Sequence, residues 1–412
     1  MKRSLVVAIV LAGWIDSVEA APYVYVTNFG SSSPGPRATV SVIDAATDEV
    51  VADIPVGPFP EGVTVSPDGR TVYVANFDST TLSVIDAATN TVRATIDGFV
   101  GPEGIAVSPD GQRLYVTNFT FPGKISVVDA NTYEIVHTID VGLFVPSALA
   151  ISPDGHWLYA TTRGSRDEQY PCNSVCLLPV FAIDTTIDHD ITVRPSRYLG
   201  WSISIALSAD GAHAFVPANP GHFSLWGLNL PNLRDQWTAQ GLWYYVAVRP
   251  GSNFLYATTP SDISVIDAID GSIVNTIPVS DASSASGLAI TPDGAKVYVA
   301  DAQTNSVVVV DANANVVSRR VIVGDAPSQI AIGPENPPFS PPPTQSPIPD
   351  CTGDCNRNDI VTIDEIIAAV QIALRQTFLL TCSACDRNHD GAVTIDELLA
   401  AVRAALNGCE PT

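Results

Sequence analysis

Two short segments near the C-terminus concentrate oxygen-bearing side chains at regular spacing. The second runs from Asp386 to Glu397, with Asp, Asn and Asp at its first, third and fifth positions, Gly at the sixth and Glu at the twelfth. Calcium takes about six to eight oxygen ligands, and this spacing brings carboxylate, amide and backbone oxygens to one point. The predicted Ca²⁺ ligands are Asp386, Asn388, Asp390, the carbonyl of Ala392, Thr394 and Glu397.

The first segment, from Asp354 to Glu365, repeats this spacing with two departures. Asn358 replaces a carboxylate, and Asp359 stands where the sharp turn of the loop favours Gly. We therefore expect weaker calcium binding in this segment. The predicted ligands are Asp354, Asn356, Asn358, the carbonyl of Ile360, Thr362 and Glu365.

Each segment is followed by apolar residues at helical spacing, and a Pro-rich linker over 335–350 precedes the first. Both segments match the EF-hand calcium loop, and the pair of loops with following helices over 351–412 resembles a dockerin. The resemblance implies a calcium-stabilised α-helical module for attachment, with a cohesin-like extracellular protein as partner. The recognition positions hold Ile363-Asp364 and Ile395-Asp396, where dockerins usually have hydroxyl side chains.

The elements before the linker repeat with a period of about 40 residues, with four short alternating strands and a Ser-Pro-Asp-Gly turn in the typical unit. Seven inner and seven second strands are found, which predicts an all-β, seven-bladed β-propeller over 21–334. The chain starts with a second strand at Tyr23–Asn28, so the last blade should combine three N-terminal strands with one C-terminal strand. The predicted inner strands are Gly62–Val65, Gly104–Val107, Ala148–Ile151, Ile203–Leu207, Tyr245–Val248, Gly287–Ile290 and Gln329–Ile332.

The ends of the second strands show a family resemblance. Tyr25-Val26-Thr27-Asn28 and Tyr115-Val116-Thr117-Asn118 resemble the YVTN-family propeller repeat of secreted and surface-layer prokaryotic proteins, over about 22–334. The fourth and fifth units depart from the motif at Tyr159–Thr162 and Phe215–Ala218. The resemblance implies the propeller fold and leaves the ligand open.

The loops of the fourth unit depart most from the repeat and contain several cationic residues. The predicted ligand-binding residues are Arg163, Arg166, Arg194, Arg197 and Trp201. Guanidinium groups pair well with carboxylates, so an anionic small molecule or a glycan is the expected ligand. The alternative is that these are solvated charges paired with Asp167 and Glu168. The phenylalanines Phe29, Phe77 and Phe119 are expected on the same face, as packing residues rather than as a sugar platform.

The N-terminus has the pattern of a secretory signal peptide over 1–20. Lys2 and Arg3 precede an apolar run, and small residues end at Ala20. We therefore expect a secreted protein, extracellular, at the cell surface or periplasmic, with no membrane span. A formal charge of −23 argues against nucleic acid as a partner.

Seven cysteines fit an oxidising compartment. Cys172 and Cys176 lie in one loop and are expected to form a disulfide. The other five lie in 351–412, so at least one of them is left without a partner in that region.

No catalytic motif stands out, and no catalytic residue is predicted. The sequence contains no G-x-S-x-G, H-E-x-x-H or phosphate-binding loop. The first hypothesis is a secreted binding protein whose calcium module serves attachment or protein–protein interaction. The alternatives are a lactonase-like propeller enzyme and a structural surface-layer component. A carboxylate cluster in the central channel would favour the enzyme, and a channel without a pocket would favour the structural component.

Overall fold

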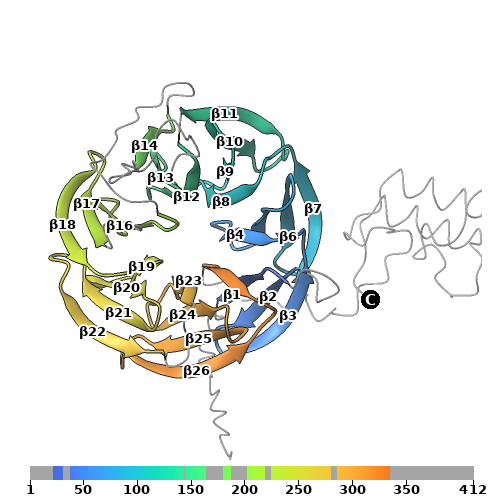
Figure 1. Cartoon of the computed structure of the whole chain (residues 1–412). Helices are drawn as coiled ribbons and strands as arrows, with labels where there is room; N and C mark the ends of the chain where they lie inside the picture. The colour runs from blue at the N-terminus through green and yellow to red at the C-terminus, as the bar shows by residue number, and fades with distance from the viewer. Residues whose placement is uncertain are drawn as a thin grey trace, which may run out of the picture. The chain divides into compact units, whose positions relative to one another are not determined.

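The computed structural model describes residues 22–30, 38–142, 144–163, 180–186, 202–218, 224–279 and 285–334. They form 27 strands in seven sheets, which follow one another around a central axis (Figure 1). The predicted seven-bladed propeller is confirmed. The predicted signal peptide (1–20), linker (335–350) and calcium-binding domain (351–412) lie outside the described residues.

The strand bounds follow the repeat. The strands of the first four sheets met along the chain are β1 (Tyr23–Asn28), β2 (Thr39–Asp44), β3 (Glu49–Pro55), β4 (Pro60–Val65), β5 (Thr71–Asn76), β6 (Thr81–Asp86), β7 (Thr91–Asp97), β8 (Pro102–Val107), β9 (Arg113–Asn118), β10 (Gly123–Asp129), β11 (Ile135–Gly142), β12 (Pro146–Ile151), β13 (Trp157–Thr162) and β14 (Phe181–Asp184). The remaining strands are β15 (Ala206–Leu207), β16 (His213–Ala218), β17 (Ser224–Asn229), β18 (Arg234–Gln240), β19 (Val246–Val248), β20 (Phe254–Thr258), β21 (Asp262–Asp267), β22 (Ile273–Pro278), β23 (Ala285–Ile290), β24 (Lys296–Asp301), β25 (Ser306–Asp311), β26 (Val316–Ile322) and β27 (Pro327–Ile332).

The two ends of the propeller chain meet in one blade, as predicted. Its strand order is β27-β1-β2-β3, so one C-terminal strand pairs with the first of three N-terminal strands. The pairing is antiparallel, with Val24 opposite Ile332 and Val26 opposite Ile330. Ring closure thereby removes two exposed sheet edges.

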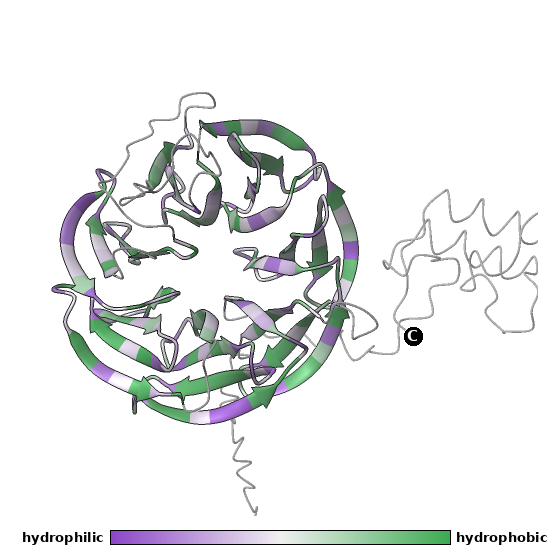
Figure 2. Cartoon of the chain, viewed as in Figure 1, coloured by the Kyte–Doolittle hydropathy of each residue, from purple (hydrophilic) through white to green (hydrophobic). Residues whose placement is uncertain are grey.

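The core lies between neighbouring blades. Strands in the middle of each blade are buried on both faces, whereas the rim strands alternate or are exposed, as in β6 and β7. One interblade cluster joins Tyr25 and Val42 of the closing blade to Val72 and Val74 of the next blade. Figure 2 shows the hydropathy that accompanies this difference in burial: hydrophilic residues are mixed into the rim strands β7, β18 and β26. Among the described residues, no helix could span a membrane.

The Ser-Pro-Asp-Gly turns form as the sequence predicts. In the first of them, the Ser66 hydroxyl donates to Asp68 over 2.5 Å, and the backbone N–H of Arg70 donates to the same carboxylate over 3.1 Å. Gly69 adopts a φ of 72°, which glycine reaches without strain. The third strand β6 ends at Asp86, whose carboxylate accepts a backbone N–H bond from Ala88 in the following turn.

Two details of the strand prediction were wrong. The regular inner strands begin earlier than predicted, at Pro60 rather than Gly62 for example. The inner strand predicted at Ile203–Leu207 is only Ala206–Leu207. There the Ser202 hydroxyl donates to the carbonyl of Ser204, and this local bond competes with the strand ladder. In the blade of β12, β13 and β14 the described residues supply three strands, because the segment after Thr186 lies outside them.

Replacing Ile330 of β27 with Ala tests the closing strand. Ile330 is 8% exposed and packs against the core of the closing blade. We expect Ile330→Ala to lower the free energy of unfolding by about 3 kcal/mol. Ile322→Ala is the matched control, because Ile322 is 72% exposed on β26; it should change stability by less than about 0.5 kcal/mol. Equal effects of the two variants in denaturant unfolding would contradict the closure.

Candidate functional site in the central channel

The inner strands approach one another closely around the channel. A Cβ added to Gly62 would lie 2.0 Å from the carbonyl oxygen of Glu103, and one added to Gly104 would lie 2.1 Å from that of Ser147. Only glycine fits such a contact between neighbouring backbones. The residues just before these glycines, Glu61 of β4 and Glu103 of β8, are therefore held on adjacent strands at the channel.

Arg163 reaches this place from the end of β13. Its backbone N–H donates to the carbonyl of Val145, as Phe77 does to Phe59 and Phe119 does to Val100. Arg163 thus replaces the phenylalanine that ends the second strand in other blades. Its Nη2 atom lies 2.9 Å from Oε1 of Glu61 and 2.9 Å from Oε1 of Glu103. We call Glu61, Glu103 and Arg163 the channel cluster.

Burial changes the protonation of the channel cluster. The Glu103 side chain is only 6% exposed, and it accepts a 2.5 Å hydrogen bond from the Ser147 hydroxyl. Burial, reinforced by the charge of Glu61, raises the pKa of Glu103 to about 7, although Arg163 and Ser147 act in the opposite direction. Burial likewise raises the pKa of Glu61, against the lowering effect of Arg163.

Two polar atoms of the channel cluster have no hydrogen-bond partner among the described residues. They are Oε2 of Glu103 and Nε of Arg163, and both are buried. Leaving a buried charged group without a partner costs about 1–3 kcal/mol or more, so such atoms call for an explanation. One is an acceptor and the other a donor.

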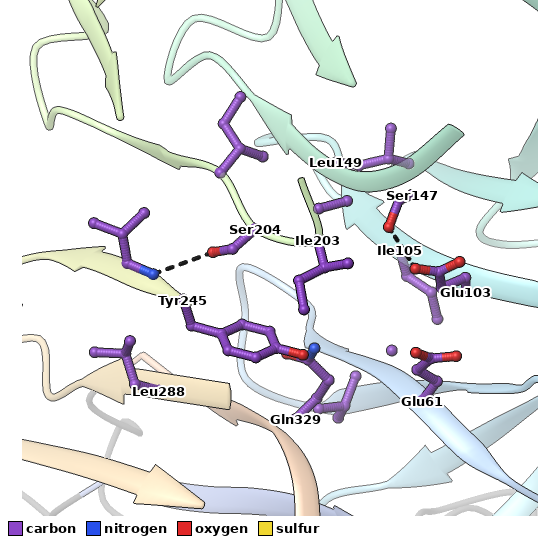
Figure 3. A pocket seen from close by; sticks show the side chains of 16 residues that line it. Glu61, Glu103, Ile105, Ser147, Leu149, Ile203, Ser204, Tyr245, Leu288 and Gln329 are labelled. Carbon is purple, nitrogen blue, oxygen red and sulfur yellow. Dashed lines mark hydrogen bonds between the residues drawn. The ribbon is translucent and has the colours of Figure 1, made fainter. Parts of the chain in front are cut away.

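A cavity of about 180 Å³ adjoins the channel cluster and is lined from all seven blades. Its acidic side contains Glu61 and Glu103, and Ser147 of β12, in the next blade, donates a hydrogen bond to Glu103 (Figure 3). Its other lining residues are Gly62, Val63, Gly104, Ile105, Ala148, Leu149, Ile203, Ser204, Ile205, Tyr245, Val246, Leu288 and Gln329. In Figure 3 the ring of Tyr245 extends toward Gln329 and the acidic side. Burial raises the pKa of Tyr245, and the charge of Glu61 adds to this effect.

Sequence reasoning found one member of the channel cluster and missed two. Arg163 was predicted to bind ligand, and the structure places its guanidinium between Glu61 and Glu103. A signal for both glutamates was present, because Pro-Glu-Gly occurs at the same place in two repeats, at 60–62 and 102–104. The other predicted residues of this face, Arg166, Arg194, Arg197 and Trp201, lie outside the described residues. The Cys172–Cys176 pair and all the predicted calcium ligands also lie outside them.

The phenylalanines at the ends of β1, β5 and β9 form a row with Phe59, which sequence reasoning did not include. Phe29 stacks on Phe59 with ring centroids 4.1 Å apart, Phe59 lies 6.1 Å from Phe77, and Phe77 lies 5.4 Å from Phe119. The Phe29–Phe59 and Phe77–Phe119 contacts join consecutive blades, whereas Phe59 and Phe77 belong to the same blade. The expectation that these residues pack the blades agrees with the contacts.

A second hollow of about 630 Å³ contains Asp110, Asp154 and His156. Both carboxylates belong to Ser-Pro-Asp-Gly turns and accept hydrogen bonds from Ser108 and Ser152. These hydrogen bonds hold the pKa of each carboxyl below its usual range. The two aspartates are therefore satisfied within their turns. In the part of the chain that is described, no three His, Cys, Asp or Glu side chains gather where they could hold a metal ion.

Comparison with known proteins supports the propeller. Residues 6–169 match the family described as YNCE-like beta-propeller. The hydrazine synthase of Kuenenia stuttgartiensis is 21% identical, with a TM-score of 0.58 over 67% of this chain and 90% of that one. A functionally unknown protein from Desulfotomaculum acetoxidans is 18% identical, with a TM-score of 0.61 over 76% of this chain and 99% of that one.

A third structure, dihydro-heme d1 dehydrogenase NirN in complex with DHE, is 17% identical, with a TM-score of 0.53 over 76% of this chain and 75% of that one. No curated protein matches the sequence. At these identities the solved structures share the fold with this chain, and the family match covers the first part of the propeller.

The titration of Glu103 should appear in the pH dependence of stability. Its pKa in the folded state, about 7, lies above the usual 4.5, so the folded state binds this proton more tightly than the unfolded chain. The resulting stabilisation is complete below about pH 4.5 and is lost as the pH rises through about 7. Glu103→Gln removes this titration.

We expect the wild-type free energy of unfolding to fall more steeply than that of Glu103→Gln over this range, by at most about 1.4 kcal/mol per pH unit. The control is Glu134→Gln, because Glu134 is exposed at the rim; it should keep the wild-type profile. The measurement is denaturant unfolding at a series of pH values. Parallel profiles for wild type and Glu103→Gln would contradict the assignment.

Proposed function

We propose that this protein is an exported binding protein whose propeller binds a small polar ligand in the channel cavity. The proposed C-terminal module, residues 351–412, binds calcium and attaches the propeller to an extracellular partner. The observation that supports channel binding best is the channel cluster, two of whose buried atoms find no hydrogen-bond partner in the described part of the chain, beside a cavity lined from every blade.

The channel cluster is not required by the ring. The residues equivalent to Glu61 and Glu103 in the blades of β12, β23 and β27 are Ser147, Ser286 and Ser328, and those blades form without carboxylates there. Burying two carboxylates with one guanidinium is expensive, and such an arrangement is often no more stable than an apolar one. Perturbed charged groups beside a cavity are typical of functional sites. Ligand binding explains their presence.

The alternative of a lactonase-like enzyme has one observation in its favour. The pKa of Glu103, raised to about 7, suits a general acid that works near neutral pH. Against it, Oε1 of each glutamate is already bound to Nη2 of Arg163, which restrains both carboxylates. Recognition needs such fixed groups, so binding is the function that this geometry supports better.

The attachment part of the proposal follows from the sequence. Loops that end in Glu365 and Glu397 have calcium-ligand spacing, and a small domain of about 60 residues usually needs a metal or disulfides for stability. A propeller already closes its own core. Calcium should therefore act on the C-terminal module.

Filling the channel cavity tests the binding function. Ile203 lines the cavity, so Ile203→Trp should occupy it. We expect small-molecule fragments to bind the full chain in ligand-observed NMR and to lose at least tenfold in affinity with Ile203→Trp. Ile273→Trp is the control, because Ile273 is 53% exposed on the rim strand β22. Fragments that bind Ile203→Trp as well as wild type, or no fragment binding at all, would refute the proposal.

Calcium titration of the full chain tests the attachment module. We expect two binding events of unequal affinity by calorimetry, because the loop from Asp354 lacks the Gly and a carboxylate. Glu397→Gln should remove the tighter event and Glu365→Gln the weaker one. Glu134→Gln should leave both unchanged. An unaltered titration in the two loop variants would show that calcium binds elsewhere.

A further inference from the structure

We propose that the channel ligand is a small organic cation: a primary ammonium group held by Glu61 and Glu103, with its apolar part against Ile203, Leu288 and Tyr245. This inference rests on the proposed binding function and names the class of ligand. In this cavity two carboxylates, those of Glu61 and Glu103, face an otherwise uncharged lining (Figure 3).

The two carboxylates already share a cationic nitrogen. Nη2 of Arg163 lies 2.9 Å from an oxygen of each glutamate, so the oxygens are spaced to bind one N–H donor group between them. An ammonium group is a compact charge with three N–H donors. It can therefore contact both glutamates and still direct a third N–H to Oε2 of Glu103, for which the described residues supply no donor.

The charge of the site favours a cation over an anion. With both glutamates ionised, the channel cluster has one positive and two negative charges. The chain as a whole, the channel cluster included, has a formal charge of −23, which attracts cations and repels anions. Arg163 is thus neutralised within the cluster. For Arg166, Arg194 and Arg197, which lie outside the described residues, the predicted ligand is still an anion.

The lining opposite the glutamates is suited to an apolar group. Ile203 and Leu288 belong to blades on the other side of the cavity, and in Figure 3 the Tyr245 ring extends toward the glutamates. A cavity of about 180 Å³ limits the ligand to a small amine. A single aromatic or short aliphatic group attached to an ammonium fits this combination of size and polarity.

Arg163 becomes an internal competitor in this arrangement. Its side chain is 27% exposed, compared with 12% for Glu61 and 6% for Glu103, so it lies on the solvent side of the carboxylates. An incoming ammonium must share the carboxylate oxygens with the guanidinium or displace it. Removing the guanidinium should therefore strengthen amine binding, whereas removal should weaken binding if Arg163 itself holds an anionic ligand.

Amine binding should also release protons near neutral pH. The titratable and charged groups that face Glu103 are Glu61 from β4, Arg163 after β13 and Tyr245 before β19, and Ser147 of β12 donates a hydrogen bond to it. A bound ammonium favours the ionised form of Glu103. Calorimetry in buffers of different ionisation enthalpy measures the protons released at pH 7.

The test uses the full chain and three probes of nearly equal shape: benzylamine, benzyl alcohol and benzoate. Titration should show benzylamine binding at least tenfold more tightly than benzyl alcohol, with benzoate weakest. Glu61→Gln and Glu103→Gln should each weaken benzylamine binding at least tenfold. Glu134→Gln should leave it unchanged. Arg163→Ala should tighten it at least threefold, and the two glutamine variants keep the test decisive if Arg163→Ala does not fold.

Several results would overturn the inference. Equal binding of the three probes, a preference for benzoate, or loss of benzylamine binding in Arg163→Ala would each show that the site does not select a cation. If benzylamine bound neither wild type nor Arg163→Ala, the inference of a cation site would also be overturned. The fragment screen with Ile203→Trp separates these results from failure of the binding function, because neutral or anionic fragments that require the cavity would leave that function intact.

Discussion

Closure of the ring by its two chain ends is the constraint on which the structure depends. β27 pairs with β1, so a strand from the end of the propeller sequence completes a blade begun at its start. Without this pairing, β1 and β27 would each expose an edge with unpaired N–H and C=O groups. Closure also holds the inner strands in a narrow circle. The contacts at Gly62 and Gly104, where any Cβ would meet a neighbouring carbonyl, are the local result.

The narrow circle of inner strands brings charged side chains of the channel close together and buries them. Side chains that would be solvated on an open sheet are brought beside one another and away from water. Glu61 and Glu103 therefore interact strongly with each other and with Arg163, and burial raises the pKa of both carboxyl groups. Removal from water makes these interactions stronger, and it also makes burial of Oε2 of Glu103 costly, because no described residue donates a hydrogen bond to it. The same geometry thus explains the perturbed titration and underlies the proposed ligand binding.

Sequence reasoning reached Arg163 by a departure from the repeat. Arg163 opens a loop of the fourth unit that breaks the repeat, and such a departure draws attention. It did not reach Glu61 and Glu103, because a glutamate in a half-exposed strand has the ordinary interpretation of a solvated charge. The partner of Arg163 was expected nearby at Asp167 or Glu168. Instead one carboxylate that binds it lies 102 residues away along the chain.

The sequence by itself determined the number of blades, the ring closure and the turns. The strands and turns depend on period-two alternation and on hydrogen bonds between close neighbours, such as Ser66 with Asp68, so a local stretch of residues suffices to specify them. The blade number and the ring closure then follow from counting these strands along the repeat. Only the tertiary structure decided the short strand Ala206–Leu207 and the meeting of Glu61, Glu103 and Arg163. The physical reason is that the positions of inner-strand side chains relative to one another depend on ring radius and blade packing, which no local pattern encodes.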